Sequence, residues 1–151
     1  MLVKILAELF ERDVNKLKAE IGSYANEGDL WKSGGEIANP AGNLCLHLAG
    51  NLRHFFGSVL GGTDYVRDRD AEFSSKYVPR AQMLAEVDAA LTDVLSTLEI
   101  LSEEDLSKLY PIEVFGKPMS TGFFLTHLAT HLNYHLGQIN YHRRLTAAES
   151  N

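Results

Sequence analysis

Three histidines near the carboxyl end of the chain, His127, His131 and His135, are spaced four residues apart. In a helix, residues four apart lie on the same face in successive turns, so this spacing predicts three stacked imidazole rings. The neutral imidazole ring is the commonest protein ligand for divalent metals such as zinc, and an i, i+4 pair lets one helix supply two ligands. A metal site is therefore the first hypothesis that the sequence suggests.

A mononuclear site of this kind needs a further ligand from a second element. His47 and His54 are the two histidines that precede this segment, and their seven-residue spacing places them on one face of a helix. We favour His47 as the partner of His131 and His135. The alternative is that these histidines are hydrogen-bonded packing residues at the edge of an apolar face. The segment lacks the glutamate of a zincin His-Glu-x-x-His motif, so metalloprotease chemistry is not indicated.

The elements that must position these histidines follow from the spacing of the apolar residues. Apolar side chains recur every three or four residues in four segments, which is typical of amphipathic helices with one buried face. The predicted helices run from Leu2 to about Tyr24, from about Pro40 to Leu60, from Pro79 to Leu98, and from Ser120 or Thr121 to about Leu145. Asn39 is a favourable N-cap residue and proline is favourable at the first helical position, so the second helix has a clear start.

The connections between these helices contain no convincing series of strands. We expect a glycine-rich loop over Asn26–Asn39, a long connection over Gly61–Val78, a short acidic turn after Ser102, and a small hairpin or extended segment over Tyr110–Met119. The predicted fold is therefore an all-α four-helix bundle that spans residues 1–151 as a single domain. Long connections after the first and second helices leave room for a crossover topology.

The histidines of the last predicted helix share its buried face. At about 100° per residue, His131 lies about 40° and His135 about 80° from His127 around the helix axis. Phe124 lies at about 60° and Leu132 at about 140° on the same scale, so the histidine stripe merges with the apolar stripe. Metal ligands placed in this way would line the interior of the bundle or its mouth.

The composition of the chain limits the kinds of molecule that the protein is expected to bind. The chain has 14 basic and 20 acidic residues and a formal net charge of −6, and no segment concentrates lysine and arginine, so nucleic acid is not an expected partner. We expect neither a signal peptide nor a membrane-spanning segment, and hence a soluble cytoplasmic protein. The single cysteine, Cys45, cannot form an internal disulfide and is expected to be a buried, inert thiol.

Two short segments carry a resemblance to a known family. His47 within Leu46–Asn51, and His131–Gln138 with the pattern His-x-x-x-His-x-Gly-Gln, together resemble the DinB-like superfamily of bacterial metal-binding four-helix bundles. The resemblance covers most of the chain, because Leu30-Trp31, Asn39–Arg53 and Tyr65–Phe73 are also similar to one branch of that superfamily. It implies that His47, His131 and His135 form the metal triad and that His127 and His54 lie outside it.

The same resemblance implies an up-down-down-up bundle, often a homodimer, that holds a divalent ion such as zinc or nickel through three histidines. The coordination positions left open would accept water or a small-molecule substrate. Some relatives are transferases or isomerases that use a low-molecular-weight thiol such as bacillithiol, mycothiol or glutathione.

Three functions follow as expectations. The leading one is a metal-dependent transferase that joins such a thiol to a small electrophilic substrate, with Arg67 or Arg69 binding a carboxylate of the thiol. The second is a metal-dependent hydrolase in which Asn51 or Gln138 orients the substrate; these two side chains are also candidates for hydrogen bonds to the ligand histidines. The third is a non-catalytic metal-binding or stress-response protein, expected if His127 or His54 supplies a fourth ligand and closes the site.

Overall fold

The computed structural model describes residues 1–150, and over that range the chain is a helical bundle without a named strand. The long helices are α1 (Leu2–Gly22), α2 (Ala41–Leu52), which continues directly into the π-helical segment η2 (Arg53–Leu60), α4 (Arg80–Ile100) and α6 (Thr121–Ser150). The short elements are η1 (Glu27–Trp31), α3 (Arg69–Ser74) and α5 (Glu103–Ser107). The predicted all-α bundle is confirmed.

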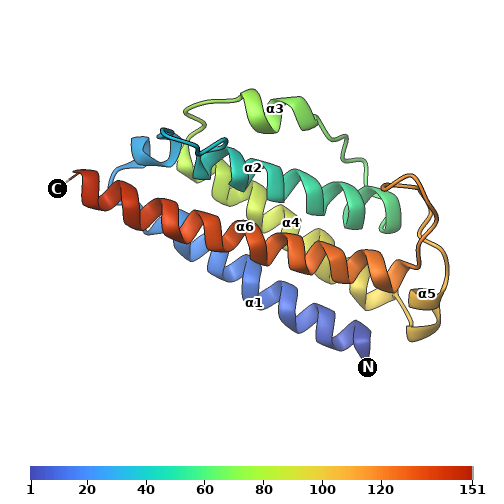
Figure 1. Ribbon diagram of the computed structural model, residues 1–151. Helices are drawn as coiled ribbons and strands as arrows, with labels where there is room; N and C mark the ends of the chain where they lie inside the picture. Colours follow the sequence, from blue (N-terminus) through green and yellow to red (C-terminus); the bar gives the residue numbers. More distant parts are fainter. Residues whose placement is uncertain (151) are drawn as a thin grey trace.

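The four long helices are arranged around a common core. Helices α1 and α6 run in one direction and α2 and α4 in the other, which gives an up-down-down-up order along the chain (Figure 1). Each of α1 and α2 packs against both α4 and α6, and α3 lies against the outer side of α2. Because α2 and α6 are neighbours, a histidine on α2 can meet histidines on α6.

Aromatic side chains fill the centre of the bundle. Phe10, Phe56 and Phe124, from three different long helices, are fully buried. The rings of Phe10 and Phe56 meet edge to face with their centroids 5.0 Å apart, which is a favourable aromatic geometry. Trp31 is also buried, and it packs on α2 where Gly42 leaves room for its ring.

The connections differ in detail from the sequence-based expectation. The connection after η2 contains the short helix α3, which was not predicted, because its six residues are too few to show a helical period. The segment between α5 and α6 forms no hairpin and is a loop closed by one antiparallel bridge between Leu109 and Ser120. Helix α6 continues past Leu145 to Ser150, because Ala147 and Ala148 favour a helix and Thr146 is buried against the bundle.

Residues 53–60 form a π-helix rather than an α-helix. His54 is the second residue of this segment and does not belong to the group of convergent histidines. His54 instead contacts the ring of Phe55, at a centroid distance of 4.7 Å.

Within residues 1–150, no helix combines the length and the hydrophobicity needed to cross a bilayer.

Substitution of Phe10 tests the core. Phe10→Ala removes a fully buried ring and its contact with Phe56, so we expect the free energy of unfolding to fall by about 3–5 kcal/mol. Urea denaturation followed by circular dichroism measures the change. Ile5→Ala, at a half-exposed position of the same helix, should cost less than about 1 kcal/mol; equal losses in the two variants would contradict this description of the core.

Candidate metal centre

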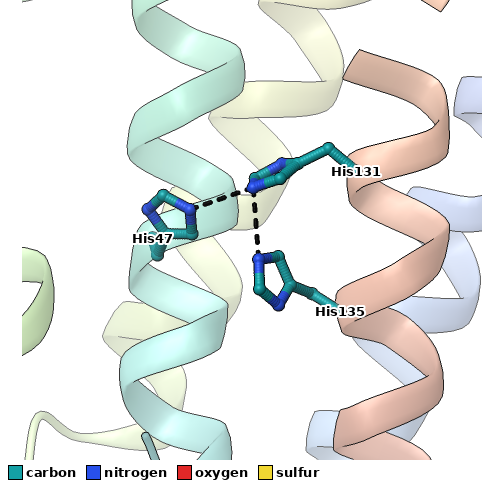
Figure 2. Close-up of side chains that lie close together, drawn as sticks. All are labelled: His47, His131 and His135. Carbon is teal, nitrogen blue, oxygen red and sulfur yellow. Dashed lines mark hydrogen bonds between the residues drawn. The ribbon is translucent and has the colours of Figure 1, made fainter. Parts of the chain in front are cut away.

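Three histidines from two helices converge at the seam between α2 and α6. His47 comes from α2, and His131 and His135 come from successive turns of α6 (Figure 2). The Nε2 atom of His131 lies 3.1 Å from Nε2 of His47 and 3.1 Å from Nε2 of His135. The ligand atoms of all three side chains lie within 4.8 Å of one another. These residues could therefore hold one metal ion.

The separations of these nitrogens agree with metal coordination. Zinc–nitrogen bonds of about 2.0–2.1 Å in a tetrahedral arrangement place two ligand nitrogens about 3.3 Å apart. The two measured separations of 3.1 Å are close to this value. The third pair, His47 and His135, lies within 4.8 Å, so these two side chains would have to adjust to seat an ion.

His47 is oriented by a buried carboxylate. The Nδ1 atom of His47 lies 3.0 Å from Oε1 of Glu72, which belongs to α3. Arg67 donates to both carboxylate oxygens of Glu72, at 2.8 and 2.9 Å. Burial alone would raise the pKa of Glu72, but the hydrogen bonds from His47 and Arg67 and the charge of Arg67 outweigh it, and the pKa is lowered. An ionised Glu72 only accepts hydrogen bonds, so Nδ1 of His47 carries a proton, and Nε2 is the nitrogen that could offer a lone pair toward the other histidines.

His135 is held in the same way by an amide. Its Nδ1 atom lies 2.7 Å from Oε1 of Gln138, one turn further along α6. With the amide oxygen as acceptor, Nδ1 carries the proton and Nε2 presents its lone pair to the cluster. Burial lowers the pKa of His135, which favours this neutral ring.

His131 lies between the other two imidazoles and cannot satisfy both. Burial, reinforced by the neighbouring imidazoles, lowers the pKa of His131 to about 3, so the ring is neutral and carries one proton. A proton on Nε2 can serve only one of the two 3.1 Å contacts, and Nδ1 of His131 is buried without a hydrogen-bond partner. A cation bound by three lone pairs would remove this conflict, so the residues present fit a metal ion.

Glu72 was not predicted as a site residue from the sequence. Its carboxylate lies against Gly50 of α2. A Cβ at Gly50 would clash with the Glu72 carboxylate, so the glycine makes room for it. Asn43, buried on α2, donates from its amide to the carbonyl oxygens of Glu72 and Ser75 at 2.9 and 2.8 Å and anchors α3. The one sequence feature that could have indicated this close contact is Gly50, a glycine inside a predicted helix.

The remaining candidate residues lie around the cluster but do not join it. The ring centroid of His127 is 6.3 Å from that of His131 and 4.9 Å from that of Phe115, and neither His127 nor His54 belongs to the group of convergent ligands. Asn51 is buried, and its Oδ1 atom has no hydrogen-bond partner. These positions give no fourth ligand within the described part of the chain.

The two arginines of the connection have different environments. Arg67 is engaged by Glu72 and nearly buried, with 11% of its side chain exposed, so it is not available to bind a carboxylate of a thiol. Arg69 is exposed, and its guanidinium lies 5.3 Å from the ring centroid of Phe73, which in turn lies 4.9 Å from the ring of His47. Arg69 therefore stands at the rim of the cluster.

Cys45 and His142 are buried and lie outside the group of convergent histidines. Cys45 is fully buried, and burial raises the pKa of its thiol to about 12, which agrees with the predicted inert thiol. His142, seven residues after His135, is buried. Its Nε2 atom lies 2.7 Å from the carbonyl oxygen of Lys32 and its Nδ1 atom 2.7 Å from the hydroxyl of Tyr24. Both ring nitrogens are thus engaged, and His142 holds the loop after η1 against α6.

Removal of the Glu72 charge tests its role in orienting His47. We expect Glu72→Gln to lower the affinity for Zn²⁺ by about 10–100-fold, because loss of a carboxylate partner weakens a histidine ligand by roughly this factor. Competition with a chromogenic chelator measures the affinity. Asp70→Asn, which removes an exposed charge from the same short helix, is the matched control. Equal affinities in the two variants would exclude an orienting role for Glu72.

Comparisons with known proteins agree with this architecture. A crystal structure of a conserved protein from Enterococcus faecalis is similar over 96% of each chain, with a TM-score of 0.75 and 16% sequence identity, which shows a shared fold. A comparison with curated proteins found no match. Residues 4–150 match the sequence model of a protein family described as "Protein of unknown function (DUF1572)". The chain therefore belongs to the DUF1572 family.

Proposed function

We propose that this protein binds one divalent metal ion, zinc or nickel, through the Nε2 atoms of His47, His131 and His135. The observation that carries the proposal is the convergence of these three atoms, with Glu72 and Gln138 placed to hold protons on the opposite nitrogens of two of the rings. Imidazole suits both ions, and the donor set alone does not choose between them.

We further propose that the chain is a DinB-like protein. Support comes from the up-down-down-up order of the long helices and from the placement of one histidine on α2 and two on α6. These are the features that the resemblance in the sequence implies for that superfamily.

The proposed reaction joins a low-molecular-weight thiol such as bacillithiol to a small electrophile. The sulfur forms a bond to the electrophilic carbon, the leaving group departs with its bonding electrons, and the thiol proton passes to solvent. A bound divalent ion with three protein ligands supplies Lewis acidity that lowers the pKa of a thiol in this site. In support, the convergent group comprises three histidines, so neither His127 nor His54 completes a closed four-ligand site among the residues described.

The chain's own residues would position the reactants. Arg69 is the better candidate for binding a carboxylate of the thiol, because it is exposed at the rim of the cluster while Arg67 is paired with Glu72. Arg67 instead stabilises the carboxylate that orients His47. This assigns the two arginines of the connection to separate tasks.

Elemental analysis of the purified, untagged protein tests the metal site. We expect about one divalent ion per chain and its loss in His47→Ala, His131→Ala and His135→Ala, because each substitution removes one of three ligands. His54→Ala, which alters a histidine outside the group, should keep the ion. A wild-type protein that remains empty and also refuses Zn²⁺ and Ni²⁺ on titration would refute the proposal.

A thiol-dependence assay tests the reaction. Metal-loaded protein is incubated with bacillithiol, mycothiol or glutathione and a reactive electrophile such as 1-chloro-2,4-dinitrobenzene, with metal-free protein as the control. We expect a rate above the control with at least one thiol, and a KM for that thiol raised about tenfold or more in Arg69→Ala, because a charge-assisted hydrogen bond is lost. Lys4→Ala on α1 should change neither value. Turnover of an ester probe without thiol would favour the hydrolase function. Inactivity with every thiol would refute the proposed transferase function.

A further inference from the structure

We propose that a cavity of about 520 Å³ next to His135 binds the electrophilic substrate and selects an uncharged, apolar molecule. This inference rests on the proposed metal site, because the cavity is assigned to a reactant through its position beside the histidine cluster. It adds a substrate class and a specificity surface to that function. The volume lies within the range of about 300–1,000 Å³ that is typical of small-molecule sites.

Apolar side chains from three parts of the chain form the walls. Tyr141 and Leu145 come from α6, Leu44 from α2, and Ile37 from the loop between η1 and α2. Tyr141, Leu145 and Ile37 are 65, 56 and 45% exposed, although side chains of this size gain by burial. Single exposed apolar residues need no explanation, but a group around one cavity indicates a ligand site.

The wall formed by the loop is held in place by its own contacts. The carbonyl oxygen of Lys32 is 2.7 Å from Nε2 of the buried His142, which ties the start of the loop to α6. Gly35 has a φ of 57°, and the amide of Ile37 donates to the carbonyl oxygen of Gly34 at 3.1 Å, which closes a turn before Ile37. The apolar wall is therefore formed before any ligand binds.

One side of the cavity is formed by His135, the one histidine of the proposed metal centre that lines it. His135 and Gln138 both line it, and His135 also belongs to the convergent group. A molecule that places its apolar part between Ile37 and Leu145 would therefore have its other end beside the cluster. This is the arrangement that a reacting group requires.

The lining of the cavity offers no cationic side chain to an anionic ligand, and the Arg144 guanidinium lies 5.3 Å from the ring centroid of Tyr141 without belonging to that lining. No lysine or arginine lines the cavity, and Glu36 is the charged residue in its lining. His142 also lines it, but both of its ring nitrogens already have partners. A carboxylate would thus lose its hydration without gaining a cation. Since the thiols considered above carry carboxylates, the uncharged electrophile is the better occupant, while Arg69 lies on the α3 side of His47 and outside this lining.

The first test uses metal-free protein and does not depend on the proposed function. N-phenyl-1-naphthylamine is an uncharged fluorophore, and 8-anilino-1-naphthalenesulfonate is an anion built on the same rings. We expect the uncharged probe to bind at least tenfold more tightly, and its affinity to fall at least tenfold in Leu145→Asp. Ile5→Asp places the same charge in a different apolar groove, between α1 and α6, and should leave the affinity unchanged.

The second test asks whether the cavity leads to the metal. Cobalt-loaded protein is titrated with acetohydroxamate and with 3-phenylpropionohydroxamate, and binding is followed in the visible spectrum of the ion. We expect the phenyl compound to bind at least tenfold more tightly, because its ring would leave water for the apolar wall. Leu145→Asp should abolish this preference without changing the affinity for acetohydroxamate.

These outcomes separate the two proposals. Protein that binds no cobalt but shows the expected fluorophore results would refute the metal site and leave the apolar cavity supported. Equal binding of the two fluorophores, or equal effects of Leu145→Asp and Ile5→Asp, would overturn the cavity as a site for uncharged ligands. Cobalt binding without a preference for the phenyl compound would overturn its assignment to the reactant.

Discussion

The arrangement around the seam of α2 and α6 depends on one constraint: three imidazoles meet at a partly buried site, and their ring nitrogens need partners. A buried polar atom without a partner costs free energy, so the positions of the surrounding groups follow from this requirement. Glu72 and Gln138 each engage the outer nitrogen of one ring, and the inner nitrogens are left facing one another. Glu72 of α3 and Gln138 of α6 therefore provide partners for ring nitrogens of the cluster. Gly50 contributes indirectly, because it leaves room for the Glu72 carboxylate.

The same constraint explains why a buried ion pair is present beside the cluster. Burial of Glu72 is costly on its own, and the two hydrogen bonds from Arg67 compensate for the lost hydration. Replacement of such a pair by apolar residues is often neutral or stabilising, so stability alone does not account for it. Its use is to fix the proton of His47 on one nitrogen.

The sequence was sufficient to predict what depends on local periodicity. The long helices, the buried stripe of α6 and the neighbouring positions of His131 and His135 all follow from a 3.6-residue repeat within a single segment. The placement of His47 beside them was favoured because a site of this kind needs a ligand from a second element, and the family resemblance implied it as well. Periodicity alone could not establish it, because it requires the packing order of the helices. Glu72 and the two roles of Arg67 and Arg69 were not predictable, since they depend on how a connection without a period folds back onto α2. The π-helical segment that contains His54, and the buried partners of His142, are likewise effects of tertiary packing.

Helix α3 has only six residues, and an isolated helix of that length does not persist in water. Its persistence depends on its contacts with α2, including the two hydrogen bonds from Asn43. The carboxylate that fixes His47 is thus carried by a segment able to open locally while the long helices remain folded. Opening of this connection would remove the hydrogen-bond partner of His47 Nδ1, so the affinity for a bound ion would depend on this short segment as well as on the stability of the four long helices.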